Sequence, residues 1–279
     1  MKGGRLNIVL IGLVIGLVAC DEVIELDIEQ TPPRIVIEGQ WTNVPANNFV
    51  KISQSVSFYD DRAPDRVAGA EVSILDEKGN VVVFQHNPFG STDSIGFYLP
   101  PKGVRGVVGD RYFLQVDYGG VTYRSEDVMM AVGQIDSLQA VRSVPGLIGQ
   151  SAPEDAYIVK VYAREPRETE DFYLMRFYKN NVVTRAYEND IYIADDTALG
   201  EAINGVPIPF FYNQSDTAKV EMYGITRQAY AYYLDLQFVI NNDGGMFGPP
   251  PANPVTNIDN DALGFFLVAA VTEKSIVVQ

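Results

Sequence analysis

The sequence is poor in the residues that carry much of enzyme chemistry: its 279 residues include one cysteine, Cys20, and one histidine, His86. A lone cysteine cannot form an internal disulfide, and one cysteine with one histidine cannot build a Cys/His metal cluster. A Ser-His-Asp triad would depend on His86. Because His86 follows a predicted strand and precedes Asn87-Pro88, we expect it to be an exposed loop residue. We therefore predict no metal, no other cofactor and no enzymatic activity.

No apolar run in the sequence is long enough to cross a membrane as a helix. The run at residues 8–19 has about a dozen residues, whereas a spanning helix needs roughly 20. It follows Lys2 and Arg5 and ends in small residues, a pattern typical of a signal peptide, here residues 1–19. Its end, Leu17-Val18-Ala19-Cys20, resembles the lipobox of bacterial lipoproteins. The resemblance implies cleavage before Cys20 and attachment of the chain to a membrane through lipid on that cysteine.

Basic side chains are scarce, with 21 lysines and arginines against 36 aspartates and glutamates. Loss of Lys2 and Arg5 with the signal peptide would leave 19 basic side chains and a net charge of −17. Nucleic acid and anionic lipid surfaces repel such a polyanion, so we predict neither as a partner.

The first half of the mature chain has the pattern of a β-sandwich. Residues 20–33 are acidic and end in Pro32-Pro33, which prevents a helix there and predicts a tether. Short runs rich in β-branched and aromatic residues then predict strands at 34–38, 49–54, 70–75, 81–84, 112–116 and 121–125. Turns with glycine at 76–80 and 118–120 join two pairs of them. We predict a sandwich domain at residues 34–132.

Residues 133–279 are predicted to form a second β-rich domain with one helix, so that the whole chain is mainly β. Strands are expected at 156–163, 172–178, 219–223, 263–271 and 275–278. The helix is predicted near 226–240, with Thr226 as its N-cap and Ala231, Leu234 and Phe238 on one face.

Acidic pairs are the remaining candidates for chemistry. A carboxylate-dependent hydrolase is one alternative, because glycosidases use two carboxylates about 5–10 Å apart. The pairs are Asp60-Asp61, Glu154-Asp155, Asp195-Asp196 and Asp259 with Asp261. Among 36 acids such pairs arise by chance, and none sits in a motif of that chemistry. Residues 257–261 could hold calcium through alternating oxygens but lack the glycine and the distant glutamate of an EF-hand, which favours a turn rich in Asx residues.

A proline-rich loop at residues 244–254 is the candidate contact surface. Methionine and aromatic residues mark recognition surfaces, and prolines reduce the entropy lost on docking. The candidate contact residues are Met246, Phe247, Pro249, Pro250 and Pro251. The alternative is that this loop closes the second domain with Phe247 buried.

Several passages together resemble a family of Bacteroidota lipoproteins catalogued as domain of unknown function 4249. They are the acidic stretch after Cys20 and residues 35–43, 69–74, 79–80, 109–112, 244–254, 257–258 and 262–266. The resemblance implies an immunoglobulin-like or transthyretin-like sandwich followed by a second β-rich domain. It further implies an outer-membrane lipoprotein that accompanies a TonB-dependent transporter, and it implies no catalytic residues.

The acidic residues that directly follow the lipidated cysteine indicate where in the cell the lipoprotein is sent. In Bacteroidota, residues such as Asp21 and Glu22 resemble the signal that sends lipoproteins to the cell exterior, whereas in enteric bacteria an aspartate there signals retention at the inner membrane. The family resemblance favours the exterior. We therefore expect a non-enzymatic surface lipoprotein that helps a TonB-dependent transporter capture a nutrient; the alternative is a structural or assembly lipoprotein of the outer membrane.

Overall fold

The structure is a computed structural model that describes residues 32–56, 62–143, 153, 155–164, 171–196, 202–241 and 252–279. Residues Pro33–Gln279 form one compact unit. Within the described residues the chain is mainly β with a single α-helix, α3, which confirms the predicted fold class.

The first half of the chain contributes eight strands and two short 3-10 helices. They are β1 (Ile35–Thr42), η1 (Pro45–Asn47), β2 (Phe49–Gln54), β3 (Glu71–Asp76), β4 (Val81–Val83), β5 (Gln85–His86), η2 (Thr92–Ser94), β6 (Phe97–Leu99), β7 (Arg111–Tyr118) and β8 (Val121–Val128). The two predicted turns join β3 to β4 and β7 to β8. At the first of them, the Asp76 carboxylate accepts hydrogen bonds from the backbone N–H groups of Lys78 and Asn80.

The second half contributes eight strands and the helix. They are β9 (Ile135–Arg142), β10 (Tyr157–Arg164), β11 (Phe172–Lys179), β12 (Val182–Val183), β13 (Tyr192–Asp195), β14 (Ala202–Pro207), β15 (Thr217–Ile225), α3 (Arg227–Asn241) and β16 (Leu263–Val277). Thr226 caps the helix as predicted, because its hydroxyl accepts the N–H of Ala229 at 3.3 Å.

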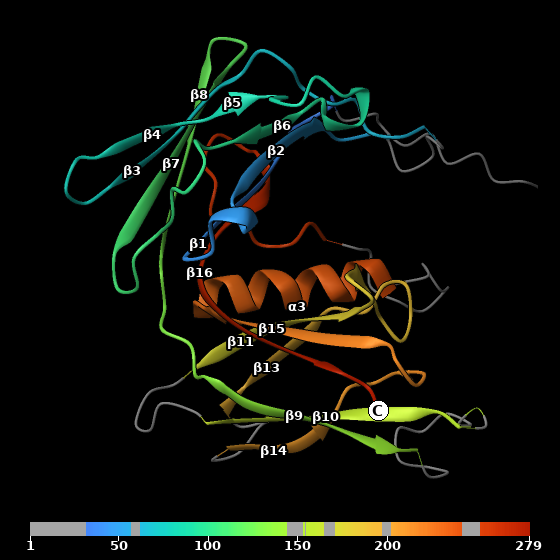
Figure 1. The fold of residues 1–279 in the computed structure, drawn as a ribbon. Coiled ribbons are helices and arrows are strands. Elements are labelled where there is room, and N and C mark those ends of the chain that lie inside the picture. Colours follow the sequence, from blue (N-terminus) through green and yellow to red (C-terminus); the bar gives the residue numbers. More distant parts are fainter. Residues whose placement is uncertain are drawn as a thin grey trace, which may run out of the picture. The chain divides into compact units, whose positions relative to one another are not determined.

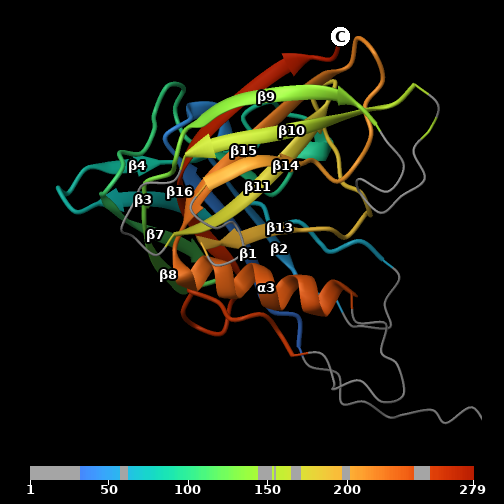
Figure 2. The ribbon, with the colours of Figure 1, turned by 90° about the horizontal axis from the view of Figure 1, so that it is seen from below.

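One nine-stranded sheet organises the unit, in the order β12-β11-β15-β16-β1-β2-β6-β5 with β13 also paired to β11. One face of this long sheet packs against two smaller sheets. The sheet β4-β3-β7-β8 covers the β1 end, and the sheet β14-β10-β9 covers the β11 end. Helix α3 covers the opposite face, as Figures 1 and 2 show from two directions.

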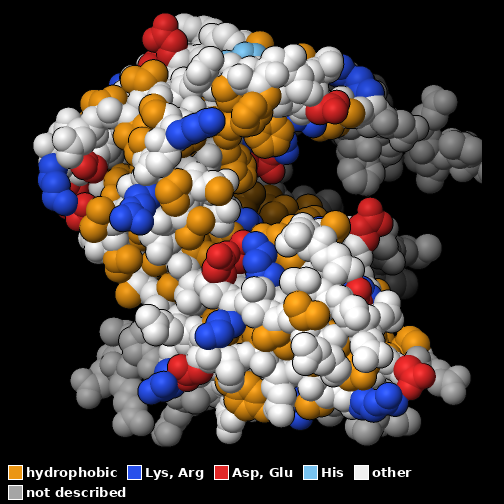
Figure 3. Space-filling view, in the orientation of Figure 1, with side chains coloured by type: hydrophobic (Ala, Val, Ile, Leu, Met, Phe, Trp, Pro, Cys, Tyr) orange, Lys and Arg blue, Asp and Glu red, His pale blue; other side chains and the backbone are white. Residues whose placement is uncertain are grey.

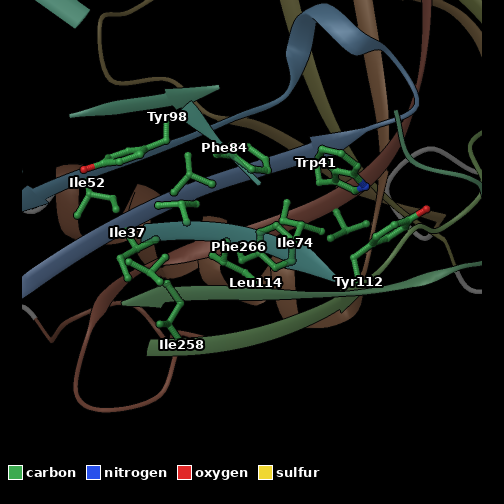
Figure 4. Close-up of a cluster of buried hydrophobic side chains, with 14 of the residues drawn as sticks. Ile37, Trp41, Ile52, Ile74, Phe84, Tyr98, Tyr112, Leu114, Ile258 and Phe266 are labelled. Carbon is green, nitrogen blue, oxygen red and sulfur yellow. The ribbon is translucent and has the colours of Figure 1, made fainter. Parts of the chain in front are cut away.

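The two faces of the long sheet pack against different layers because successive side chains of a strand point to opposite faces. In β1, Ile37 and Trp41 point into the sandwich core and are almost fully buried. Figure 4 shows them with Ile74, Leu114 and other buried side chains between β1 and the four-stranded sheet. In β15, Val220 and Met222 point into the core between the long sheet and the sheet β14-β10-β9, whereas Tyr223 and Ile225 face α3.

Strand β16 joins the two halves of the chain. It pairs in parallel with β1, with Ile37 opposite Gly264, and antiparallel with β15, with Thr217 opposite Val277. The last strand of the chain therefore lies beside the first. The predicted boundary between residues 132 and 133 falls between β8 and β9, and the division into two domains stays a prediction.

Two local predictions were wrong. Residues 263–271 and 275–278 were expected as separate strands, but they form the continuous β16, because the polar residues between them pair with β15. His86 was expected in an exposed loop, but it lies in β5 and is partly buried. Its Nε2 accepts the N–H of Gly96 at 3.1 Å, and its ring packs on Tyr98 with the centroids 4.9 Å apart.

Candidate functional site

The face of the long sheet that carries α3 holds a polar cluster in otherwise apolar surroundings. Phe172 and Leu174 of β11 and Tyr223 of β15 pack there beneath the helix. The next inward positions of the same strands are charged: Arg176 on β11 and Glu221 on β15, which lie directly opposite each other in the strand register. Burial of charged groups is costly unless they are paired and hydrogen-bonded, so the partners of these two side chains decide what the cluster does.

Both carboxylate oxygens of Glu221 have hydrogen-bond donors. It is 2% exposed, and its carboxylate accepts hydrogen bonds of 2.7 Å from Lys219, Tyr178 and Tyr223. Burial alone would raise the pKa of Glu221, but these three donors lower it below its ordinary value. Glu221 is therefore ionised, and its negative charge is already paired with the ammonium of Lys219.

Arg176 has no such partner among the described residues. Its guanidinium donates to the side-chain oxygen of Gln40 at 2.8 Å and to the hydroxyl of Tyr223 at 3.0 Å, and Tyr233 of α3 is a further hydrogen-bond partner. All three partners are neutral. Burial alone would lower the pKa of Arg176, yet the nearby tyrosines and Glu221 raise it, so the side chain stays protonated.

Arg176 lines a cavity of about 320 Å³ between β11, α3 and the segment 183–192. We call this cavity the Arg176 pocket. Leu174, Leu236, Ile191 and Ile240 give it apolar walls. Its volume lies at the lower end of the range of about 300–1,000 Å³ that is typical of small-molecule sites. Figure 3 shows a separate hollow above α3, between the helix and the strands of the sandwich, with apolar side chains inside it.

The outer wall of the pocket is held in place by its own hydrogen bonds. The hydroxyl of Tyr192 donates to Asp190 at 3.0 Å and accepts the N–H of Ala186 at 2.8 Å. Asp190 also accepts the N–H of Tyr187 at 3.0 Å. Burial raises the pKa of Tyr192 to about 12, so its hydroxyl keeps its proton. These hydrogen bonds fix the position of the segment that forms the wall.

Helix α3 presents its apolar side chains differently from the face proposed from sequence. Leu234 and Phe238 are 51% and 56% exposed. The sheet is contacted by tyrosines instead: Tyr232 stacks on Phe265 with ring centroids 4.8 Å apart, and Tyr230 packs on Phe172 at 5.1 Å. The polar tip of a tyrosine can bond the cluster below it, as Tyr233 does with Arg176.

The site residues predicted from sequence lie outside the described residues. These are the lipidation residue Cys20, the acids Asp21 and Glu22, and the contact-loop residues Met246, Phe247, Pro249, Pro250 and Pro251. Their roles stay predictions. Sequence reasoning missed Arg176 and Glu221. Arg176 stands out as a charged residue at a face position that β11 otherwise fills with apolar or aromatic side chains, whereas Glu221 shares its face of β15 with Lys219.

The acidic pairs that the structure describes serve local structure. One carboxylate oxygen of Asp196 accepts the N–H of Asp171 at 2.8 Å. Asp259 accepts the N–H of Arg124 at 2.6 Å, and Asn257 bonds both backbone groups of Phe266 at 2.9 Å. Residues 257–261 therefore form an Asx-rich turn that fastens β8 to β16.

The described residues contain no group of three or more His, Cys, Asp or Glu side chains placed to hold a metal ion. No helix among them is both long enough and apolar enough to span a bilayer.

The fold and the pocket define a β-rich protein with a cavity of small-molecule size and the guanidinium of Arg176 in its wall. The model of the family described as Domain of unknown function (DUF4249) matches residues 21–275, and the chain belongs to that family. No curated protein is significantly similar to the chain in sequence.

Proposed function

We propose that the protein is an outer-membrane lipoprotein, anchored through lipid on Cys20 and facing the cell exterior, that binds a small nutrient molecule for a TonB-dependent transporter. It catalyses no reaction in this proposal. The signal-peptide pattern and the lipobox-like residues before Cys20 support the anchor. The family match begins at residue 21, directly behind that cysteine.

The Arg176 pocket is the observation that carries the binding role. It is ligand-sized, its wall is held by hydrogen bonds, and it combines apolar side chains with a few charged ones, Arg176 among them. Small-molecule binding sites share this composition. The tyrosine hydroxyls of the neighbouring cluster have raised pKa values, because burial and the ionised Glu221 disfavour loss of their protons, which suits holding a ligand rather than moving protons.

Co-purification tests the partnership with a transporter. The protein carrying a C-terminal tag is isolated from its native cells in mild detergent, and bound proteins are identified by mass spectrometry. We expect a β-barrel transporter to be recovered with it and not with an unrelated tagged surface lipoprotein. Recovery of no transporter would remove the main support for the proposal, and a growth defect of a deletion strain on every nutrient would favour an assembly role instead.

Replacing Cys20 with serine should abolish lipid attachment, because serine lacks the thiol that receives the lipid. Cells grown with a clickable fatty-acid analogue should label the unaltered protein at its mature size and leave the Cys20→Ser variant unlabelled and unprocessed. Protease added to intact cells should cut the unaltered protein, as its exterior position requires. Equal labelling of the two proteins would refute the assignment of the anchor.

A further inference from the structure

Among the described residues the Arg176 guanidinium has no direct ion pair, although Arg185, Glu188 and Asp190 also line its pocket. Glu221 is the buried carboxylate opposite Arg176 in register, but its direct ion pair is with Lys219 at 2.7 Å, and Lys219 also lies 3.8 Å from Glu273. No ion pair within 4 Å joins Arg176 to an acid among the described residues, although the chain as a whole is strongly acidic. A partly buried cation whose direct hydrogen-bond partners are all neutral is stabilised further when an anion completes its shell.

The guanidinium also keeps unused donors. Gln40, Tyr223 and Tyr233 supply three neutral oxygens, and a guanidinium has more N–H groups than these oxygens accept. A planar guanidinium fixed by such hydrogen bonds is suited to pair with a carboxylate through two parallel hydrogen bonds. A compact ammonium would have no such preference.

The rest of the pocket selects what the carboxylate is attached to. Leu236 and Ile240 of α3 and Leu174 of β11 form apolar walls around the cation. An inorganic anion would leave those walls without a partner, whereas a short aliphatic chain would bury apolar surface against them. The volume of about 320 Å³ limits the ligand to a small molecule.

We propose that the Arg176 pocket binds a small organic acid, with its carboxylate on the guanidinium of Arg176 and its aliphatic part against Leu236 and Ile240. This names the ligand class for the binding role proposed above and rests on that role. At neutral pH the carboxylic acid is ionised, and its affinity falls once the pH drops below its own pKa, because Arg176 stays protonated throughout.

The test is calorimetric titration of the full-length protein in detergent with 4-methylpentanoate, its uncharged analogue 4-methylpentan-1-ol, and inorganic phosphate. We expect the acid to bind and the alcohol and phosphate to bind at least about tenfold more weakly. Arg176→Gln should weaken binding of the acid by about tenfold or more. Arg142→Gln, which removes an exposed arginine paired with Asp155, should leave binding unchanged.

A second variant tests the site even if Arg176→Gln does not fold. Ile240 is 40% exposed at the pocket, so Ile240→Trp should fill the cavity while keeping Arg176 and the melting temperature. Loss of acid binding in this folded variant supports the assignment. Equal binding of acid and alcohol, no binding of the acid at millimolar concentration, or unchanged binding in either folded variant would overturn it. Co-purification with a transporter does not depend on this result, so the two proposals fail separately.

Discussion

Replacement of Gly264 by alanine is expected to destabilise the protein by more than about 3 kcal/mol and to prevent normal folding. Gly264 is the second residue of β16 in the parallel pairing with β1 and has φ +94°, a backbone conformation that residues other than glycine rarely adopt. A Cβ atom there would lie 2.2 Å from the carbonyl oxygen of Ile37 and 2.8 Å from its carbonyl carbon. Both are backbone atoms of the neighbouring strand, so neither can move aside without breaking the pairing.

Gly79→Ala is the matched control for this variant. Gly79 has φ +85°, close to that of Gly264, but a Cβ atom there meets nothing within 4 Å. The control therefore measures the cost of the backbone conformation alone, about 1–2 kcal/mol. Urea unfolding of both variants separates the two contributions. If Gly264→Ala costs no more than Gly79→Ala, the close approach of β16 to β1 is not what requires glycine.

The local architecture could be predicted because it depends on neighbours in sequence. The turns at 76–80 and 118–120 have Asx and glycine residues that determine the hairpins, and β2 was predicted with its observed bounds. Helix α3 was predicted from its cap and an apolar face, and the helix is confirmed, although Leu234 and Phe238 of that face are exposed. Strands β5 and β6 were missed, because two or three residues are too few to show a period.

The long-range architecture and the candidate site could not be predicted in the same way. The pairing of β1 with β16 joins residues more than two hundred positions apart, and no periodicity within either strand indicates its partner. Arg176 and Glu221 become a cluster only when β11 and β15 pair in the observed register, because a shift of one residue would turn one of them to the opposite face. Gln40 then reaches Arg176 only because β16 places β1 in the same sheet.

Asp127 is the buried carboxylate through which the sandwich holds the helix. It is 6% exposed at the end of β8. Its oxygens accept the N–H groups of Val128 at 2.9 Å and Val268 at 3.0 Å, and the hydroxyl of Thr226, the N-cap of α3, at 3.0 Å. Burial raises its pKa from 3.8 to about 6, although these hydrogen bonds and the positive charge of Arg111 oppose the shift.

The stability of the protein should therefore depend on pH through Asp127. Folded Asp127 binds its proton more tightly than the unfolded chain does, so its contribution to folding is largest below pH ~4 and is lost as the pH rises through about 6. A shift of about two pKa units corresponds to roughly 3 kcal/mol.

Asp127→Asn removes the titration but keeps the shape of the side chain. The free energy of unfolding of the variant, measured in urea from pH 4.5 to 7.5, should rise relative to that of the unaltered protein by about 2–3 kcal/mol across this range. Other carboxylates titrate in both proteins and cancel in the difference. A difference that stays constant with pH would show that Asp127 is ionised throughout, and that its three donors outweigh its burial.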